Sequence, residues 1–524
     1  MISNQGQMRP QRTPSRSLKD LLDRYRDSVI LATEADENAI FTGIAVGTSD
    51  LAAGDIFVAF KGLRTHGANF VDRAVAAGAV AVLTDDEGAG IIATGPAAGA
   101  IPVIALRDAA TQRALVGDIA AWFYDYPARQ LVTVGVTGTN GKTTTTYFID
   151  AALSAAHLKT ALLGTVELRV GETSIPSPRT TVEAPVLQSV MAMALEAGAT
   201  ALTTEVSSHA LALNRVAGTT FDVVAFTNLQ RDHLDFHHTM EQYFADKARL
   251  FAPTAAKRGV VCVDDEWGVT LAAQADIPVD TVATRADGPG YATAQWRVSE
   301  AAVGLDRVGS TFTLLGPDGE QVTVHSPLPG MVNVSNAALA VVVAHRAGVA
   351  LEDAARGIEQ IVAIPGRMER VIDSATEPLV IVDYAHTPDA LVLALQAVRP
   401  ITEKRIVIVF GSDGDRDQGK RPIMGKIAAE LADVLVVTDE NPRSEPPEEI
   451  RRAILAGVRS QRPDLVDVHE VSPRFDAVAH GIALAGPGDT VIITGKGHEP
   501  TQEIAGVFHP YNDADAVRAA YGSA

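Results

Sequence analysis

The chain has 524 residues, of which 47% are hydrophobic and 21% charged, a composition typical of a soluble globular protein with several domains. Its formal net charge of -20 disfavours a nucleic-acid partner, because such an acidic surface repels a phosphate backbone. The single cysteine, Cys262, excludes an internal disulfide framework and indicates a reducing compartment. No apolar run is long enough to span a bilayer, so we expect a cytoplasmic protein without membrane insertion.

The first region, residues 1–128, opens with the polar stretch MISNQGQMRPQRTPSRS, which has no apolar signal-peptide core. We predict that about the first 25 residues are a disordered leader. The strand-like runs DIFVAF and AVAVLTD follow, with the helix-like stretch NFVDRAVAAGA between them.

The second region, residues 129–365, starts with the strand-like run LVTVGV, the loop TGTNGKT and a helix-like stretch from Thr143. This order is the context that a phosphate-binding loop requires, although Val136 stands where the usual motif has a glycine. Gly138 and Gly141 allow close backbone approach to phosphates, and Lys142 can neutralise their charge. The Thr143 hydroxyl is placed to hold Mg²⁺, so the stretch predicts nucleotide binding.

Polar side chains follow two later strand-like runs of this region. Glu205 and Ser207 come after the first, and Asp232 and His233 come after the second. An acidic residue in this position beyond a phosphate loop is a usual Mg²⁺ ligand. Solvated or hydrogen-bonded loop residues are the alternative, and the pattern does not choose between the two interpretations.

A helix is predicted over residues 239–251, with a capping pattern at its start and an apolar face that includes Tyr243 and Phe244. Lys247 lies on the same face. Its ammonium either reaches back to water or is a desolvated amine with a lowered pKa, and periodicity does not decide which.

The third region, residues 366–524, contains four β-branched runs, PLVIVDY, RIVIVFG, DVLVVTDE and DTVIITGKG, separated by helical segments. This alternation predicts a parallel sheet, and ligands bind at the carboxyl ends of such strands. The predicted fold class is α/β with three domains, in which a central P-loop ATPase domain with a mostly parallel sheet precedes a Rossmann-like, doubly wound C-terminal domain.

Several short segments occur in the order found in the Mur ligases: GVTGTNGKTT, EVSSHAL, FTNLQRDHLDFH, GMVNVSNAALA, PGRMERV, VDYAHTPDAL, GDRDQGKRP, ENPR and TGKGHE. The chain resembles that family over about residues 40–510, and within it the branch that adds meso-2,6-diaminopimelate. The resemblance implies a first domain for UDP, a central ATPase and a last domain that brings the amino acid. It also implies that UDP-N-acetylmuramoyl-L-Ala-D-Glu is activated by ATP as an acyl phosphate and then joined to the amino acid.

Functional residues are carried over from the family motif by motif. ATP would be bound by Gly138, Thr139, Asn140, Gly141, Lys142, Thr143, Thr144, Asn336, Arg367, Asp383 and His386. The catalytic residues would be Lys142, Lys247, His233 and Glu205. The metal ligands, for two Mg²⁺, would be Thr143, Glu205, His233 and Lys247, the last as a carbamate formed with CO₂. The UDP-muramoyl-dipeptide would be bound by Thr48, Ser49, Thr180, Thr181, Ser207 and Arg215.

The acceptor amino acid would be bound at strand ends of the third region. The implied residues are Arg416, Glu440, Asn441, Arg443, Gly495 and Glu499. Two guanidinium groups can clamp two carboxylates and a glutamate can hold an ammonium, which suits meso-diaminopimelate. L-Lysine lacks the distal carboxylate and would leave Arg443 without a partner. Glu440 stands where the family motif has aspartate.

Three alternatives stay open at this point. The same chemistry could serve L-lysine or a folylpolyglutamate-type substrate, and a P-loop protein of a different class could be a regulatory ATPase. The expected enzyme is a monomer.

Overall fold

The structure is a computed structural model that describes residues 8–34, 36–62, 65–108, 111–304, 308–374 and 376–522. By internal contacts the chain divides into two compact units, residues 1–281 with 343–350 and residues 282–342 with 351–524. Among the described residues, no helix is both long and apolar enough to cross a membrane.

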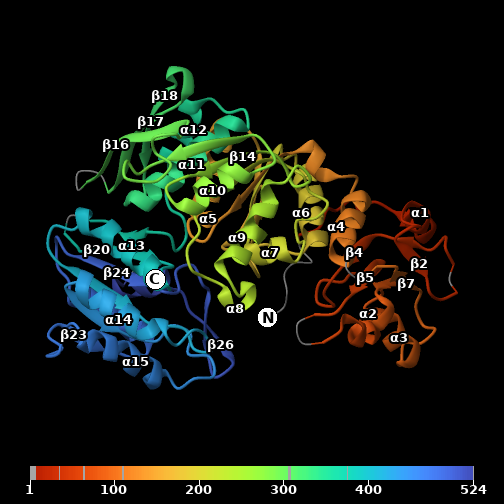
Figure 1. Cartoon of the computed structure of the whole chain (residues 1–524). Helices are drawn as coiled ribbons and strands as arrows, with labels where there is room; N and C mark the ends of the chain where they lie inside the picture. Colours follow the sequence, from red (N-terminus) through yellow and green to blue (C-terminus); the bar gives the residue numbers. More distant parts are fainter. Residues whose placement is uncertain are drawn as a thin grey trace. The chain divides into compact units, whose positions relative to one another are not determined.

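The first sheet of the first unit has five strands in the order β2-β7-β6-β5-β4 (Figure 1). These strands are β2 (Val29–Leu31), β4 (Gly43–Ala45), β5 (Asp55–Ala59), β6 (Ala81–Thr84) and β7 (Val103–Leu106). Only β2 runs antiparallel to its neighbour. The helices of this part are α1 (Leu18–Arg24), α2 (Val71–Ala76), α3 (Asp86–Thr94) and α4 (Gln112–Phe123). A small ribbon pairs β1 (Arg16–Ser17) with β3 (Ile40–Phe41).

The predicted disordered leader is wrong from Met8 onward, while residues 1–7 lie outside the described residues. Met8 is buried, and Ser17 caps α1 in a reciprocal pair with Asp20. Leu18 and Leu21 lie on the buried face of α1. The polar composition of the segment hid these few anchoring side chains, and their burial offsets the conformational entropy of ordering it.

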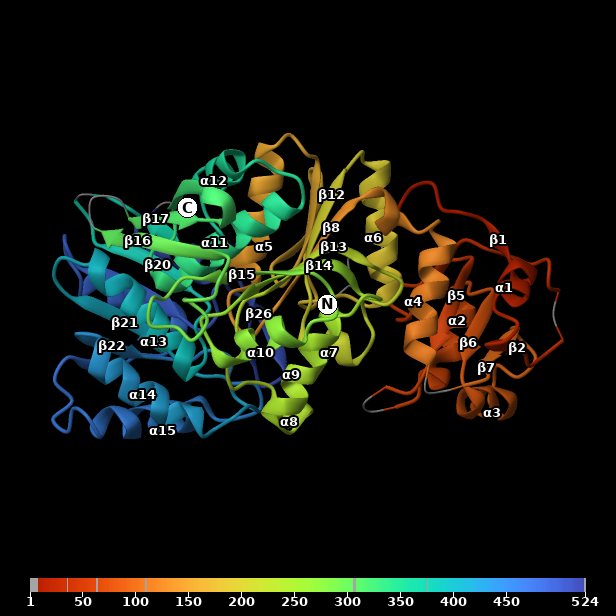
Figure 2. The same cartoon turned by 45° about the horizontal axis from the view of Figure 1, so that its top comes forward.

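The longest sheet has the order β11-β10-β9-β12-β8-β13-β14-β15-β16-β17-β18. Its strands in the first unit are β8 (Val132–Thr137), β9 (Thr160–Leu163), β10 (Glu167–Val170), β11 (Thr173–Pro176), β12 (Ala201–Glu205), β13 (Phe221–Phe226), β14 (Ala256–Cys262) and the start of β15 (Val279–Ala283). Strands β9, β12, β8, β13 and β14 are parallel, so their carboxyl ends meet at one edge. The helices are α5 (Lys142–Ala155), α6 (Ala184–Glu196), α7 (Ser208–Ala212), α8 (Leu234–His237), α9 (Met240–Ala248) and α10 (Glu266–Gln274). Figure 2 shows α5 and α6 on opposite sides of β8 and β12.

The sheet continues in the second unit with antiparallel strands, which are β16 (Trp296–Gly304), β17 (Gly309–Leu315) and β18 (Gln321–Ser326). Two helices follow them, α11 (Met331–Arg346) and α12 (Leu351–Glu359).

The last sheet has the order β19-β20-β24-β21-β22-β23. Its strands are β19 (Glu369–Ile372), β20 (Leu379–Asp383), β21 (Ile406–Phe410), β22 (Val434–Val437), β23 (Val468–Glu470) and β24 (Thr490–Thr494). All but β19 are parallel to their neighbours. The helices are α13 (Pro388–Val398), α14 (Lys420–Leu431), α15 (Pro447–Arg459), α16 (Arg474–Ala483) and α17 (Asp513–Ala520). A hairpin of β25 (Thr501–Ile504) and β26 (Val507–Pro510) follows β24.

Alternate side chains of this last sheet point to opposite faces, as the pleat of a strand requires. Val407 and Val409 of β21 pack in one core with Ala477 of α16 and Val517 of α17, whereas Ile408 between them is buried on the other face. Figure 1 shows α14 and α15 side by side, and neither helix contributes to that core. Both faces are therefore covered, which confirms the predicted doubly wound α/β domain.

The three sheets fall inside the predicted regions 1–128, 129–365 and 366–524. The three-domain α/β fold class is confirmed, and the boundaries between the domains stay predictions.

Candidate active site

The glycine loop lies between β8 and α5 and is shaped by two glycines with positive φ. Gly138 has a φ of 147°, and a Cβ there would lie 1.9 Å from the Thr227 hydroxyl oxygen. Gly141 has a φ of 85° and caps α5, so the helix N-terminus points its free N–H groups into the loop. The shorter G-T-N-G-K-T loop thus has the geometry of an anion-binding site.

Lys142 and Thr143 begin α5. The Lys142 ammonium donates to the carbonyl oxygens of Gly138 at 3.1 Å and Thr139 at 2.8 Å, so it lies over the loop. The Thr143 hydroxyl donates to Glu205 Oε1 at 3.0 Å. Glu205 ends the neighbouring strand β12 and is buried.

The Thr143 and Glu205 oxygens fit one Mg²⁺. The two oxygens lie 3.0 Å apart, and both are of the hard oxygen type that would suit Mg²⁺. Among the described residues, no three His, Cys, Asp or Glu side chains form a metal-binding group. A site with so few protein ligands suits Mg²⁺, which usually takes further oxygens from water and substrate phosphates.

Asn140 is held by the loop after β13, and Thr139 is held by Tyr243 of α9. Asn228 accepts a hydrogen bond from the Asn140 N–H at 3.0 Å, and the Thr139 hydroxyl lies 3.1 Å from the Tyr243 hydroxyl. Thr144 is buried in the first turn of α5. The predicted phosphate-loop residues are therefore close together and rigidly held.

Lys247 is 1% exposed, which excludes the alternative that its ammonium reaches water. Its Nζ donates to the carbonyl oxygen of Gly138 at 2.7 Å and lies 4.6 Å from the Tyr243 ring centroid. Burial, with the charge of Lys142 as a further cause, holds the pKa of Lys247 well below its ordinary value. A buried amine with a lowered pKa therefore contacts the phosphate loop.

His233 lies at the start of α8 with a left-handed φ of 53°. Burial lowers its pKa, and the charges of Lys142 and Lys247 lower it further. Within the described parts of the chain, no hydrogen bond or ion pair joins His233 to Glu205. The structure thus brings Thr143 and Glu205 together, and it brings Lys247 to the loop, but it does not join all four predicted metal ligands.

Further histidines lie beside His233 that the sequence did not assign to the site. His209 of α7 has its ring centroid 4.9 Å from that of His233, and burial lowers the pKa of His209 to about 4. His237 is buried between Asp246, at 2.8 Å, and the Ser208 hydroxyl, at 2.9 Å. The only sequence signal was the density of histidines in SSHAL and RDHLDFHH.

The predicted dipeptide residues gather near the end of β12. The Thr181 hydroxyl donates to the carbonyl oxygen of Glu205 at 2.9 Å and accepts from the Ser207 N–H at 3.0 Å. The Thr165 hydroxyl donates to Thr180 at 3.2 Å. Arg215 forms an ion pair with Glu183 at 3.0 Å, and these contacts fix the loop that precedes α6.

A cavity of about 220 Å³ lies in the first unit and is lined by Ser49 but not by Thr48. Other lining residues are Arg179, which directly precedes Thr180, and Glu183, which lies two residues after Thr181. The cavity is therefore lined by one of the two predicted UDP-side residues and by two residues near the predicted dipeptide residues in the chain.

In the second unit, the predicted nucleotide residues surround Tyr384, which the sequence analysis did not assign. The Arg367 guanidinium lies 4.6 Å from the Tyr384 ring centroid, and the His386 ring lies 4.6 Å from it. Asp383 accepts the N–H groups of Met368 and Ala385, so it holds this turn in place. Tyr384 and His386 provide flat rings on which a nucleobase can stack.

Asn336, the remaining nucleotide residue, is buried on α11 and donates to Asn333 at 3.2 Å.

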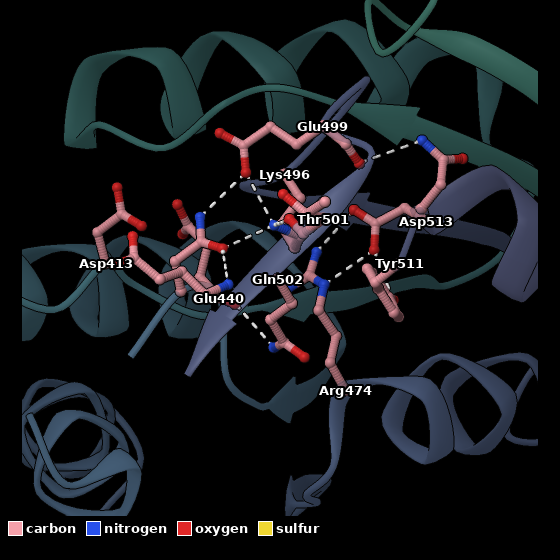
Figure 3. Close-up of polar contacts among 12 residues, drawn as sticks. Asp413, Glu440, Arg474, Lys496, Glu499, Thr501, Gln502, Tyr511 and Asp513 are labelled. Atoms are coloured by element: carbon pink, nitrogen blue, oxygen red, sulfur yellow. Dashed lines mark hydrogen bonds and ion pairs between the residues drawn. The ribbon is translucent and has the colours of Figure 1, made fainter. Parts of the chain in front are cut away.

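The predicted acceptor site lies at the carboxyl ends of β21, β22 and β24 in the second unit. Lys496 is fully buried and donates three hydrogen bonds, to Asn441 at 2.8 Å, Glu499 at 2.8 Å and the Thr501 carbonyl at 2.7 Å (Figure 3). Asn441 also donates to Glu499 at 3.0 Å. Both of these contacts use Glu499 Oε2, so the other oxygen is available to a ligand.

Glu499 and Glu440 have opposite protonation preferences. Burial would raise the pKa of Glu499, but the Lys496 ammonium and the hydrogen bonds lower it below its ordinary value. Burial raises the pKa of Glu440 to about 8, with the nearby Asp413 carboxylate as a further cause. Glu499 is therefore ionised at neutral pH and suited to an ammonium, whereas Glu440 keeps its proton.

Gly495 has a φ of 113°, and a Cβ there would lie 2.7 Å from Glu440 Oε2. That carboxylate oxygen is buried and has no hydrogen-bond partner among the described residues. The Glu440 side chain, where the family motif has aspartate, thus packs closely against the backbone of Gly495.

Arg443 has a left-handed φ of 54°, and its backbone is fixed by bonds with Glu503 and Ala505. Its guanidinium is 3.4 Å from Asp413 and 3.7 Å from Glu503. Both distances exceed the 2.7–2.9 Å or so of a strong charge-assisted bond, so the guanidinium can exchange them for a ligand carboxylate. Arg416 is exposed on the loop before α14.

The Glu440 pKa predicts a pH effect on stability. Its folded pKa of about 8 lies above the ordinary 4.5, so the stabilising effect of the protonated form is complete below pH 4.5 and is lost as the pH rises to about 8. Glu440→Gln cannot ionise, so we expect its Tm to exceed that of the wild type at pH 9 by a few °C. In a domain of this size each kcal/mol of unfolding free energy changes Tm by about 2–4 °C. Thermal unfolding at pH 5 and pH 9 measures this difference, and equal pH dependence of the two proteins would contradict it.

Lys496 is predicted to position the acceptor site. Lys496→Met removes the donor that orders Asn441 and Glu499, so we expect the KM for the acceptor amino acid to rise by about 10- to 100-fold. The KM for ATP should be unchanged in steady-state assays. Lys426→Met, an exposed lysine on α14, is the matched control. Parallel increases in both KM values would indicate a general structural defect instead.

Taken together, the loop and the strand-end clusters define a P-loop nucleotide-binding α/β protein with a separate site for a charged small molecule. Three family profiles match the chain: the Mur ligase family catalytic domain over residues 40–121, the Mur ligase middle domain over residues 136–344, and the Mur ligase glutamate ligase domain over residues 366–497. The chain is 43% identical to the UDP-N-acetylmuramoyl-L-alanyl-D-glutamate–2,6-diaminopimelate ligase of Streptomyces coelicolor, over 98% of both chains. It is 41% identical to the UDP-N-acetylmuramyl-tripeptide synthetase of Leifsonia xyli, over 98% of this chain and 97% of the relative. The chain belongs to the Mur ligase family.

Solved structures agree with this assignment. A structure of a UDP-N-acetylmuramoyl-L-alanyl-D-glutamate–2,6-diaminopimelate ligase matches with a TM-score of 0.65 and 30% identity, covering 97% of this chain and 99% of the other. MurF ligase from Thermotoga maritima in complex with ADP matches with a TM-score of 0.61 at 16% identity, which supports the fold alone.

Proposed function

We propose that the protein is an ATP-dependent ligase that joins meso-2,6-diaminopimelate to the D-glutamyl γ-carboxylate of UDP-N-acetylmuramoyl-L-Ala-D-Glu, a step of peptidoglycan precursor synthesis. The observation that supports it best is the second charged site. A phosphate loop alone fits any ATPase, whereas the ionised Glu499 and the loosely held Arg443 at the strand ends of the second unit suit an amino acid with more than one charged end.

The first step is a phosphoryl transfer. The γ-carboxylate of the substrate attacks the γ-phosphorus of ATP, and the bond from that phosphorus to the bridging oxygen breaks. ADP departs, and the substrate carboxylate has become an acyl phosphate. Lys142 and the helix N-terminus of α5 neutralise the phosphates, and Thr143 and Glu205 would hold Mg²⁺. Bound Mg²⁺ supplies positive charge that offsets the repulsion between a carboxylate and a triphosphate.

The second step forms the amide. The neutral amine of the acceptor attacks the acyl-phosphate carbonyl, the tetrahedral intermediate expels inorganic phosphate, and the amine loses a proton. No protein nucleophile takes part, so the task of the protein is to orient two substrates and exclude water. Glu499 would hold one ammonium of the acceptor, and Arg443 and Arg416 would each bind a carboxylate.

The proposal also includes a carbamate on Lys247 as a metal ligand. A neutral lysine amine adds to CO₂ and releases a proton, which yields an anionic carbamate. The burial and lowered pKa of Lys247 favour this reaction, and the anion would lie against the phosphate loop. His233, close to Lys142 and Lys247, would act with it in holding a second Mg²⁺.

We infer that the enzyme works as a monomer in the cytoplasm, where its nucleotide-linked substrate and ATP are both present. The single cysteine agrees with a reducing compartment.

One assay tests the proposed function against a regulatory ATPase. Phosphate release is measured with ATP and UDP-N-acetylmuramoyl-L-Ala-D-Glu, with and without meso-diaminopimelate. We expect release to require both substrates, and release that ignores both would refute the ligase assignment. Competition between meso-diaminopimelate and L-lysine then identifies the acceptor, a useful test because the name of the Leifsonia relative specifies only a tripeptide.

A further inference from the structure

The N-terminal strap, defined here as residues 8–12, contributes Met8 and Arg9 to the lining of the cavity that Ser49 also lines. Met8 is 1% exposed, and its carbonyl accepts a hydrogen bond from the Ser189 hydroxyl at 3.4 Å. The N–H groups of Gln11 and Arg12 donate to the Glu196 carboxylate at 2.6 and 3.0 Å. Both anchors lie on α6, so the strap is tied to the helix that follows the predicted dipeptide loop.

Arg9 ties the same strap to the first sheet. Its guanidinium donates to both oxygens of Asp55, at 2.9 and 2.7 Å, and to the carbonyl oxygen of Asp50 at 2.6 Å. Asp55 is 1% exposed and begins β5. A Cβ on Gly43 would lie 2.1 Å from Asp55 Oδ1, so the neighbouring strand leaves room for this pair only with glycine there. A buried, bidentate pair of this kind fixes geometry as well as charge.

These contacts use three of the five N–H donors of the guanidinium. Arg9 lines the cavity, and its side chain is 19% exposed. The two remaining N–H groups have no acceptor among the described residues and are available to a ligand. Arg179 adds a second guanidinium to the same cavity.

We propose that the N-terminal strap completes the binding site for the nucleotide end of the UDP-linked substrate, and that Arg9 positions the loop 47–50 there. Ser49 and Asp50 line the cavity together with Arg179 and Glu183, which lie beside the predicted dipeptide residues Thr180 and Thr181 in the chain. Arg9 holds the Asp50 backbone. The matched family profile begins only at residue 40, so the strap lies outside it. This inference rests on the proposed function.

The test is steady-state kinetics of Arg9→Ala with each substrate varied in turn. We expect the KM for UDP-N-acetylmuramoyl-L-Ala-D-Glu to rise by about tenfold or more, the loss expected for hydrogen bonds to a charged group. The KM values for ATP and the amino acid should stay within about twofold. Arg12→Ala removes the same charge from an exposed side chain of the same strap, and it should behave like the wild type.

Removing Arg9 leaves the buried Asp55 carboxylate without its charged partner, which destabilises the folded protein. Arg9→Ala with Asp55→Asn removes both charges, so its thermal unfolding should resemble the wild type while its KM for the UDP-linked substrate stays raised. Arg9→Lys keeps one charge without the bidentate contact, and an intermediate KM is expected.

Calorimetric binding of the UDP-linked substrate separates the two levels of the hypothesis. A wild-type protein that does not bind it would contradict the proposed function. A wild type that binds it, with Arg9→Ala binding equally well, would overturn the role of the strap alone. An equal rise in all three KM values would also overturn it, because positioning of one loop affects one substrate.

Discussion

Replacing Lys247 by alanine is expected to lower kcat by at least about 10²-fold, the usual effect of removing one charged group from the transition-state environment. The amine lies 2.7 Å from a carbonyl oxygen of the phosphate loop and is almost completely buried. A carbamate there would place an anion beside Lys142, and alanine removes both the amine and the site of carbamylation.

Added formate or acetate should partly restore the activity of Lys247→Ala, because a small carboxylate fits the space left by the lysine and supplies the missing charge. The measurement is kcat against carboxylate concentration. Lys257→Ala, which removes an exposed lysine paired with Asp222, is the control that should be insensitive to both changes. Full activity of Lys247→Ala without additives would show that the amine serves only packing.

Replacing Arg443 by alanine is expected to lower kcat/KM for meso-diaminopimelate by about 10²- to 10⁴-fold, because a site built to pair a polar group depends strongly on that pair. The left-handed backbone of Arg443 is held by β25, so the guanidinium position is set before substrate binds. Its long contacts with Asp413 and Glu503 leave it able to receive a carboxylate.

The competing acceptor makes this prediction specific. L-Lysine has no distal carboxylate, so Arg443→Ala should change its kcat/KM much less, and the ratio of the two acceptors should fall. Arg452→Ala, an exposed arginine of α15, is the control. A wild type that prefers L-lysine, or an unchanged ratio in Arg443→Ala, would contradict the specificity argument.

The two acceptor-site glutamates illustrate what position in the fold adds to residue type. As letters in ENPR and GKGHE they are equivalent acids. In the structure Glu499 accepts from Lys496 and Asn441, whereas Glu440 has a buried oxygen without a partner beside Asp413. Lys496 lies in GKGHE, the motif of Glu499. Its three acceptors, on Asn441, Glu499 and Thr501, come together only when the ends of β22 and β24 and the start of β25 meet.

The strap at residues 8–12 is the clearest failure of the sequence interpretation. Its composition is polar, and polar composition over a short window predicts disorder. Arg9 is ordered by Asp55 and Asp50, some forty residues away, and the strap by Glu196 of α6, still more distant. Such long-range contacts leave no local periodic signal.

The sequence by itself determined the fold class, the phosphate loop and the family, because these depend on local patterns: β-branched runs between helices, and glycines followed by Lys-Thr at a strand end. Only the tertiary structure decided that the Lys247 amine is buried against that loop, that Glu440 and Glu499 differ in protonation, and that Arg9 lines the same cavity as Ser49. Burial and neighbouring charge set these properties, and both arise from residues far apart in the chain.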